Sequence, residues 1–134
     1  MSKETQKRRV LIVDDDPVII KMVGTLLTTN GYEVLTATDA PVGLEIAMQK
    51  SPDLLILDVM MPIINGFNIC RLMKTQSGSQ HIPIILLTSR DRDDDRKIGE
   101  EVGANAYIAK PFKTEELLNT ISGLLAAPNQ SLGK

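Results

Sequence analysis

Five short apolar runs alternate along the chain with longer segments of helical periodicity, and this alternation constrains the fold more than any other feature. The runs span residues 10–13, 32–37, 53–57, 82–87 and 106–109. Most are almost continuously apolar, as is typical of strands that are buried on both faces of a parallel sheet. Because crossovers between parallel strands are right-handed, the pattern predicts an α/β fold with one open parallel sheet and helices on both faces.

Amphipathic segments between the runs supply the predicted helices. Residues 17–29 carry an apolar stripe along one face, and residues 114–126 repeat the pattern. Asp16 is expected to cap the first of these helices, with Pro17 at its first position, and Thr114 to cap the last. The remaining helical segments are 40–50, 65–76 and 92–102.

Length and composition limit the classes of protein that the chain can belong to. Its 134 residues suit one domain rather than two. The net charge of −2 gives no general attraction to nucleic acid, so we expect no direct DNA binding. Cys70 is the only cysteine, which excludes an internal disulfide. No apolar run approaches the ~20 residues that span a bilayer, so no membrane contact and a cytoplasmic location are predicted.

Polar residues stand where several predicted strands end. Asp14 and Asp15 follow the first strand, Asp58 the third, Thr88 the fourth and Lys110 the fifth. In open α/β sheets the functional site lies outside the carboxyl ends of the strands. The topology therefore predicts that these carboxylates, the hydroxyl and the ammonium group converge on one edge of the sheet.

Such a cluster has a definite chemistry. Asp14, Asp15 and Asp58 repel one another, and a hard cation such as Mg²⁺ neutralises them and bridges to phosphate. A carboxylate can act as a nucleophile toward phosphorus and form an aspartyl phosphate. Lys110 and Thr88 are placed to stabilise charge on the transferred phosphoryl oxygens.

The same residues lie in motifs that resemble the response-regulator receiver domains of two-component signalling. The resemblance runs from about Arg9 to Leu125 and rests on five segments: 10–16, 58–62, 65–66, 83–88 and 103–112. It implies a flavodoxin-like (βα)5 three-layer sandwich with a five-stranded parallel sheet of order 2-1-3-4-5. The expected organisation is a flexible N-terminus (1–8), the receiver (9–126) and a disordered tail (127–134).

The resemblance also assigns roles to positions that match the family's motifs. It implies that Asp58 is the phosphoacceptor and a metal ligand, and that Asp14, Asp15 and the backbone carbonyl of Met60 complete the protein's share of a Mg²⁺ site. Mn²⁺ is expected to substitute for Mg²⁺.

Three further roles follow from the resemblance. Thr88 and Tyr107 match the family's switch pair, in which the hydroxyl moves toward the phosphoryl group and the ring turns inward. Lys110 matches the lysine that contacts phosphate, and its bond to Pro111 is expected to be cis.

The implied function is that of a signalling switch rather than an enzyme, with only self-phosphorylation and slow autodephosphorylation. The phosphoryl donor would be a histidine kinase or a histidine phosphotransfer protein. Contacts with a downstream effector or output domain would change through the face formed by the fourth helix, the fifth strand and the fifth helix. A phosphorylation-dependent homodimer is a further expectation.

Two other functions fit parts of the sequence. Asp14-x-Asp16-x-Val18 resembles the nucleophile motif of haloacid-dehalogenase-like phosphatases, with Asp14 attacking phosphate and Asp16 as acid/base, although the helix predicted from Pro17 leaves no room for their flap. A binding module that keeps the fold without phosphorylation is the other alternative. Outside the strand ends, the charged run 91–96 is interpreted as a solvated first helical turn.

Overall fold

The computed structural model describes residues 7–126 and contains one five-stranded parallel sheet of order β2-β1-β3-β4-β5. The strands are β1 (Arg9–Val13), β2 (Glu33–Ala37), β3 (Leu54–Leu57), β4 (Ile84–Thr88) and β5 (Ala106–Ala109). The helices are α1 (Pro17–Thr29), α2 (Ala40–Lys50), α3 (Gly66–Lys74), α4 (Asp93–Glu101) and α5 (Thr114–Leu125). The predicted α/β class, the flavodoxin-like fold and the strand order are confirmed. Of the expected terminal segments 1–8 and 127–134, residues 1–6 and 127–134 lie outside the described residues.

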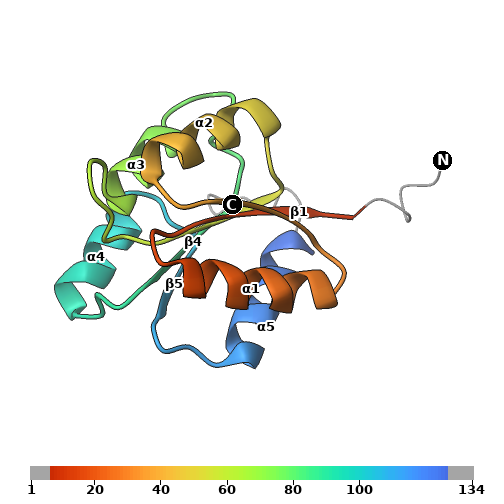
Figure 1. Ribbon diagram of the computed structural model, residues 1–134. Helices are drawn as coiled ribbons and strands as arrows, with labels where there is room; N and C mark the ends of the chain where they lie inside the picture. Colours follow the sequence, from red (N-terminus) through yellow and green to blue (C-terminus); the bar gives the residue numbers. More distant parts are fainter. Residues whose placement is uncertain (1–6, 127–134) are drawn as a thin grey trace.

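The helices form two layers, one on each face of the sheet (Figure 1). Helices α1 and α5 cover one face, and their apolar side chains pack with alternate residues of the central strands. Helices α2 and α3 cover the other face, and α4 contributes Ile98 to the same core. In an open α/β sheet of this kind, the functional site lies outside the carboxyl ends of the strands.

Burial of the central strands explains why their sequences are apolar throughout. Every residue of β3 and of β4 is buried, because helices cover both faces of the sheet at these positions. The buried apolar residues form two cores, one on each face of the sheet. Among residues 7–126, no helix is long and apolar enough to cross a membrane.

Two predicted helix starts have different outcomes. Asp16 caps α1 as expected, since its side chain accepts a hydrogen bond from the Val18 N–H at 2.9 Å. Thr114, however, is the first residue of α5, and Lys113 holds the capping position without a side-chain hydrogen bond. The acidic pair Glu115 and Glu116 in the first turn favours the same helix start electrostatically.

Candidate functional site

Pairing of β1 with β3 brings Asp14 and Asp58 together. Val13 and Leu57 are partners in the register of the two strands, so the residue after each emerges at the same height. The Asp58 backbone N–H donates to the Val13 carbonyl at 2.9 Å, which extends the pairing by one residue. Both carboxylates are nearly inaccessible to solvent, with Asp14 2% and Asp58 6% exposed.

Asp15 completes an acidic cluster with these two residues. One carboxylate oxygen from each of Asp14, Asp15 and Asp58 lies within 4.8 Å of the others. Asp15 is exposed, whereas its two partners are buried, so the cluster opens to solvent on one side. Three carboxylate oxygens are hard ligands that fit Mg²⁺. The chemistry of the donor set therefore agrees with the metal that the sequence predicts.

Lys110 supplies the positive charge of the site. Its Nζ lies 2.8 Å from Asp14 Oδ2 and 3.7 Å from Asp58 Oδ1. The Lys110 backbone N–H donates to the Thr88 carbonyl at 2.9 Å, which fixes the turn after β5 beside the end of β4. The peptide bond between Lys110 and Pro111 is cis.

The surroundings of Asp58 act on its pKa in both directions, and the net effect is a rise. Burial raises the pKa of Asp58 above its ordinary value, and the negative charge of Asp14 raises it further. The Lys110 ammonium, the Met60 backbone and the Thr88 side chain act in the opposite direction but do not cancel the rise. A cation at the acidic cluster would therefore stabilise the ionised, nucleophilic form.

Gly66 allows the loop after β3 to pack directly against Asp58. A Cβ at this position would lie 2.3 Å from the Asp58 carbonyl oxygen, a contact that no side chain can make. The Gly66 N–H donates to the Val59 carbonyl at 2.8 Å, and Asn65 caps α3 by accepting from the Asn68 N–H at 3.0 Å. The Asn-Gly pair of the sequence motif therefore supports the backbone of the site.

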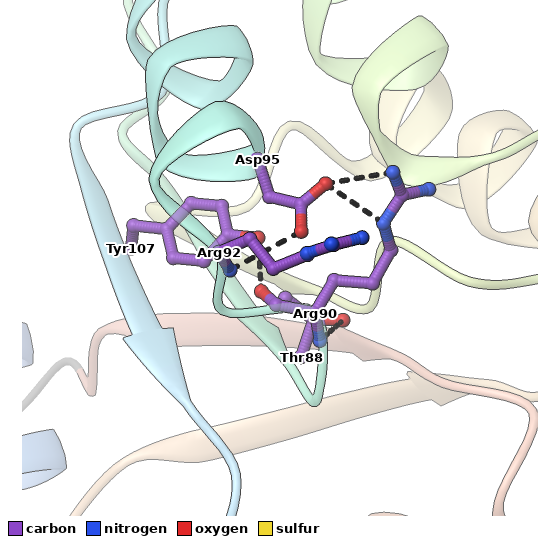
Figure 2. A network of polar contacts seen from close by, with 5 residues as sticks. All are labelled: Thr88, Arg90, Arg92, Asp95 and Tyr107. Carbon is purple, nitrogen blue, oxygen red and sulfur yellow. Dashed lines mark hydrogen bonds and ion pairs between the residues drawn. The ribbon is translucent and has the colours of Figure 1, made fainter.

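Thr88 and Tyr107 meet at the backbone of one residue, Arg90 (Figure 2). Thr88 is fully buried, and its Oγ1 accepts a hydrogen bond from the Arg90 N–H at 3.2 Å. The Tyr107 hydroxyl donates to the Arg90 carbonyl. Burial raises the pKa of Tyr107 to about 12, so the phenol stays protonated and remains a donor.

The interpretation of residues 91–96 as a solvated turn is wrong at Asp95. Asp95 is 3% exposed and accepts hydrogen bonds from the Arg90 guanidinium at 3.0 and 2.7 Å. The other acidic residues of the run are exposed, as expected. Sequence reasoning missed the pair because one charge in a charged run gives no sign of burial. The available signal was the position of Asp95 in the first turn of a helix, where its carboxylate can reach back to the preceding loop.

Asp16 lies outside the acidic cluster. Its side chain caps α1, and the helix begins directly at Pro17. A phosphatase of the haloacid-dehalogenase type needs this residue as an acid/base at the site, so the structure does not favour that alternative.

The family profile described as response regulator receiver domain matches residues 10–122. Among curated relatives, the DNA-binding dual master transcriptional regulator RpaA of Synechocystis is 38% identical over 117 residues, which are 87% of this chain and 48% of the relative. The chain belongs to the response regulator receiver domain family. It spans about half the length of the first curated relatives that it matches.

Solved structures agree with this assignment. The chemotaxis protein CheY4 of Vibrio cholerae superposes with a TM-score of 0.84 at 37% identity, covering 90% of this chain and all (100%) of that one. The receiver domain of the sensor histidine kinase PA1611 of Pseudomonas aeruginosa has a TM-score of 0.83 at 28% identity, covering 90% and 99% of the two chains. That structure holds a magnesium ion coordinated in its active-site cleft.

Proposed function

We propose that this receiver domain accepts a phosphoryl group on Asp58. The observation that carries the proposal is the position of this carboxylate: it is buried, lies in the acidic cluster with Asp14 and Asp15, and has the Lys110 ammonium 3.7 Å away. In the reaction, a carboxylate oxygen of Asp58 forms a bond to phosphorus while the bond from phosphorus to the leaving group breaks. The leaving group keeps that electron pair, and an imidazole leaving group takes its proton from solvent.

The residues around Asp58 have separate tasks in this reaction. Mg²⁺, or Mn²⁺ in its place, would be held by Asp14, Asp15, Asp58 and the carbonyl of Met60. When bound, the ion would neutralise charge on the phosphoryl oxygens. Lys110 is close enough to both buried carboxylates to contact a phosphoryl oxygen on Asp58.

The proposal makes the protein a switch rather than an enzyme with turnover. The donor would be a histidine kinase or a histidine phosphotransfer protein in the cytoplasm. Thr88 and Tyr107 would report phosphorylation to the α4–β5–α5 face, which would contact a downstream effector, an output domain or a second copy. The net charge of −2 supports protein contacts rather than direct DNA contacts.

Intact mass after incubation with acetyl phosphate and Mg²⁺ tests the acceptor. Wild type should gain one phosphoryl adduct, which should be absent without Mg²⁺ and absent in Asp58→Asn. Asp53→Asn is the matched control, because Asp53 precedes β3 at the opposite end of the strand and is exposed. Absence of an adduct from wild type would support the non-phosphorylated binding module. An adduct that survives in Asp58→Asn but not in Asp14→Asn would restore the phosphatase hypothesis.

Tyrosine emission tests the switch pair, because the chain has two tyrosines and no tryptophan. In a Tyr32→Phe background, Tyr107 is the only tyrosine left. Beryllofluoride with Mg²⁺, which mimics the phosphoryl group, should change its emission, and Thr88→Ala should remove most of that change. An unchanged response in Thr88→Ala would contradict the assignment of these two residues as a pair.

A further inference from the structure

Arg90 joins three parts of the molecule through separate groups (Figure 2). Its backbone N–H donates to Thr88, its carbonyl accepts from Tyr107, and its guanidinium reaches Asp95 in the first turn of α4. The end of β4, the ring on β5 and the start of α4 are therefore all bonded to one residue. A displacement of Arg90 would therefore alter its hydrogen bonds to all three elements.

Of these three contacts, the bond to α4 is the one between two charged groups. Asp95 Oδ1 accepts from both Arg90 Nε and Nη2, at 3.0 and 2.7 Å, and Oδ2 accepts from the Arg92 N–H at 3.2 Å. Both carboxylate oxygens are thus used, and the hydrogen bond from Arg90 holds the pKa of Asp95 below its ordinary value. A charge-assisted contact of this kind to a buried carboxylate is stronger than a neutral hydrogen bond.

A second contact restricts the guanidinium. The Arg90 Cζ lies over the Phe67 ring, 5.7 Å from its centroid, and Phe67 belongs to α3 beside the glycine that packs on Asp58. The side chain of Arg90 is 41% exposed, yet it is fixed on one side by α3 and on the other by α4. It therefore has little freedom to absorb a movement of its own backbone.

We propose that Asp95 is a positioning residue, which holds Arg90 so that a phosphoryl group on Asp58 changes the start of α4 through the Arg90–Asp95 pair. The inference rests on the proposed function of Asp58. A phosphoryl group brings new acceptor oxygens, and the Thr88 hydroxyl that turns toward them moves the acceptor of the Arg90 N–H. Because the guanidinium is bonded to Asp95, the resulting shift of residue 90 displaces the first turn of α4.

The chain offers a matched control in a second arginine–aspartate pair. Arg96 and Asp91 are also five residues apart at the start of α4, and the two arginines are similarly exposed, but the Asp91 side chain is 42% exposed whereas that of Asp95 is 4% exposed. Exposed pairs contribute little to stability or coupling. Asp91→Asn removes this pair while leaving Arg96 free to stay over the Tyr107 ring, 5.0 Å from its centroid.

Hydrogen–deuterium exchange with and without beryllofluoride and Mg²⁺ tests the proposal. In wild type and in Asp91→Asn, the phosphoryl mimic should change the exchange rate of amides in the first turn of α4 by about tenfold. In Asp95→Asn this change should be lost, while residues 88–92 still respond and acetyl phosphate still forms the Asp58 adduct. If Asp95→Asn does not fold, Arg90→Gln is the second variant. It breaks the same ion pair by changing the more exposed residue, and it should also abolish the response of α4.

Three results would overturn the inference. The first is that α4 responds to the phosphoryl mimic in Asp95→Asn as strongly as in wild type. This result would mean that the Tyr107 ring, which packs against Gly99 of α4, couples Asp58 to the helix. The second is an equal loss in Asp91→Asn. The third is that α4 of the wild type does not respond to the phosphoryl mimic although the Asp58 adduct forms. This outcome would leave the proposed function unaffected. Failure of the adduct itself would overturn the proposed function.

Discussion

The two edges of the sheet use polar side chains in opposite ways. At the amino edge, where the strands begin, such side chains bond to backbone groups that have no strand partner. Asp53 accepts from the Arg9 N–H at 2.7 Å, and Asn105 accepts from the Ile84 N–H at 2.9 Å. Each contact satisfies a donor at the start of a strand, which is a structural task.

At the carboxyl edge, by contrast, charged side chains also contact one another. Asp14 and Asp58 share the ammonium of Lys110, and burial together with the charge of Asp14 raises the pKa of Asp58. Such an arrangement destabilises the fold in the absence of a ligand and is typical of a functional site. The difference teaches that polar residues at strand ends indicate function most clearly when charged side chains contact one another, as Lys110 and the two carboxylates do.

Replacement of Lys110 should have the largest effect on stability. Lys110→Met leaves two buried carboxylates without their cation, which we expect to lower the free energy of unfolding by about 3 kcal/mol in metal-free buffer. Mg²⁺ should restore part of the loss. Urea denaturation with and without Mg²⁺ measures both effects, and carboxyl NMR should show a higher pKa for Asp58, because Lys110 lowers it in the wild type.

Lys74→Met is the matched control at the other edge. The Lys74 ammonium donates to the carbonyls of Ile82 and Gln80, at 2.8 and 3.4 Å, rather than to carboxylates. Its removal should cost about 1 kcal/mol, with no dependence on Mg²⁺ and no change in the pKa of Asp58. If Mg²⁺ changed the stability of the two variants equally, the proposed difference between the two edges of the sheet would be wrong.

Asn105→Ala should destabilise the fold without affecting phosphorylation. The Ile84 N–H loses its acceptor in a half-buried position, so the free energy of unfolding should fall by about 2 kcal/mol. Chemical denaturation gives the loss, and the yield of the phosphoryl adduct should equal that of wild type. A reduced adduct in the folded variant would show that the amino edge also serves the site.

The sequence predicted the sheet and the clustering of Asp14, Asp15 and Asp58, because strand periodicity and topology together place strand ends on one edge. It did not predict the buried partner of Arg90. Asp95 stands in a run of charges, and its partner is the Arg90 guanidinium, which also lies over the Phe67 ring of α3, a tertiary contact without local pattern. The capping position of α5 was also misplaced by one residue, because Thr is a favoured capping residue whereas here Lys113 holds that position and Thr114 begins the helix.

Asp58→Asn should show how the carboxyl edge depends on pH. The folded pKa of Asp58 is raised, so the native state binds more protons than the unfolded state between the ordinary and the raised pKa. Stability of wild type therefore falls as pH rises through this window, while Asn does not titrate. In metal-free buffer the variant should be more stable than wild type above this window, and the difference should vanish below about pH 4.

Mg²⁺ provides the control for that pH dependence. The ion stabilises ionised Asp58 in the wild type, so the advantage of Asp58→Asn should shrink or reverse when Mg²⁺ is added. Thermal melts across the pH range, with EDTA or Mg²⁺, measure the difference. An advantage that is constant with pH would mean that the carboxylate is not strained by its neighbours.

Asp53→Ala should have the smallest effect on stability of these variants, and it compares the two edges of the sheet most directly. The side chain lies at the amino edge in an exposed position, where water can replace it as the acceptor for the Arg9 N–H. We expect a loss of about 0.5 kcal/mol in urea denaturation and no change in the phosphoryl adduct. Asp53 and Asp58 lie at the two ends of β3 and have the same side chain. A loss of adduct in Asp53→Ala would therefore show that the role of an aspartate does not depend on the edge of the sheet at which it lies.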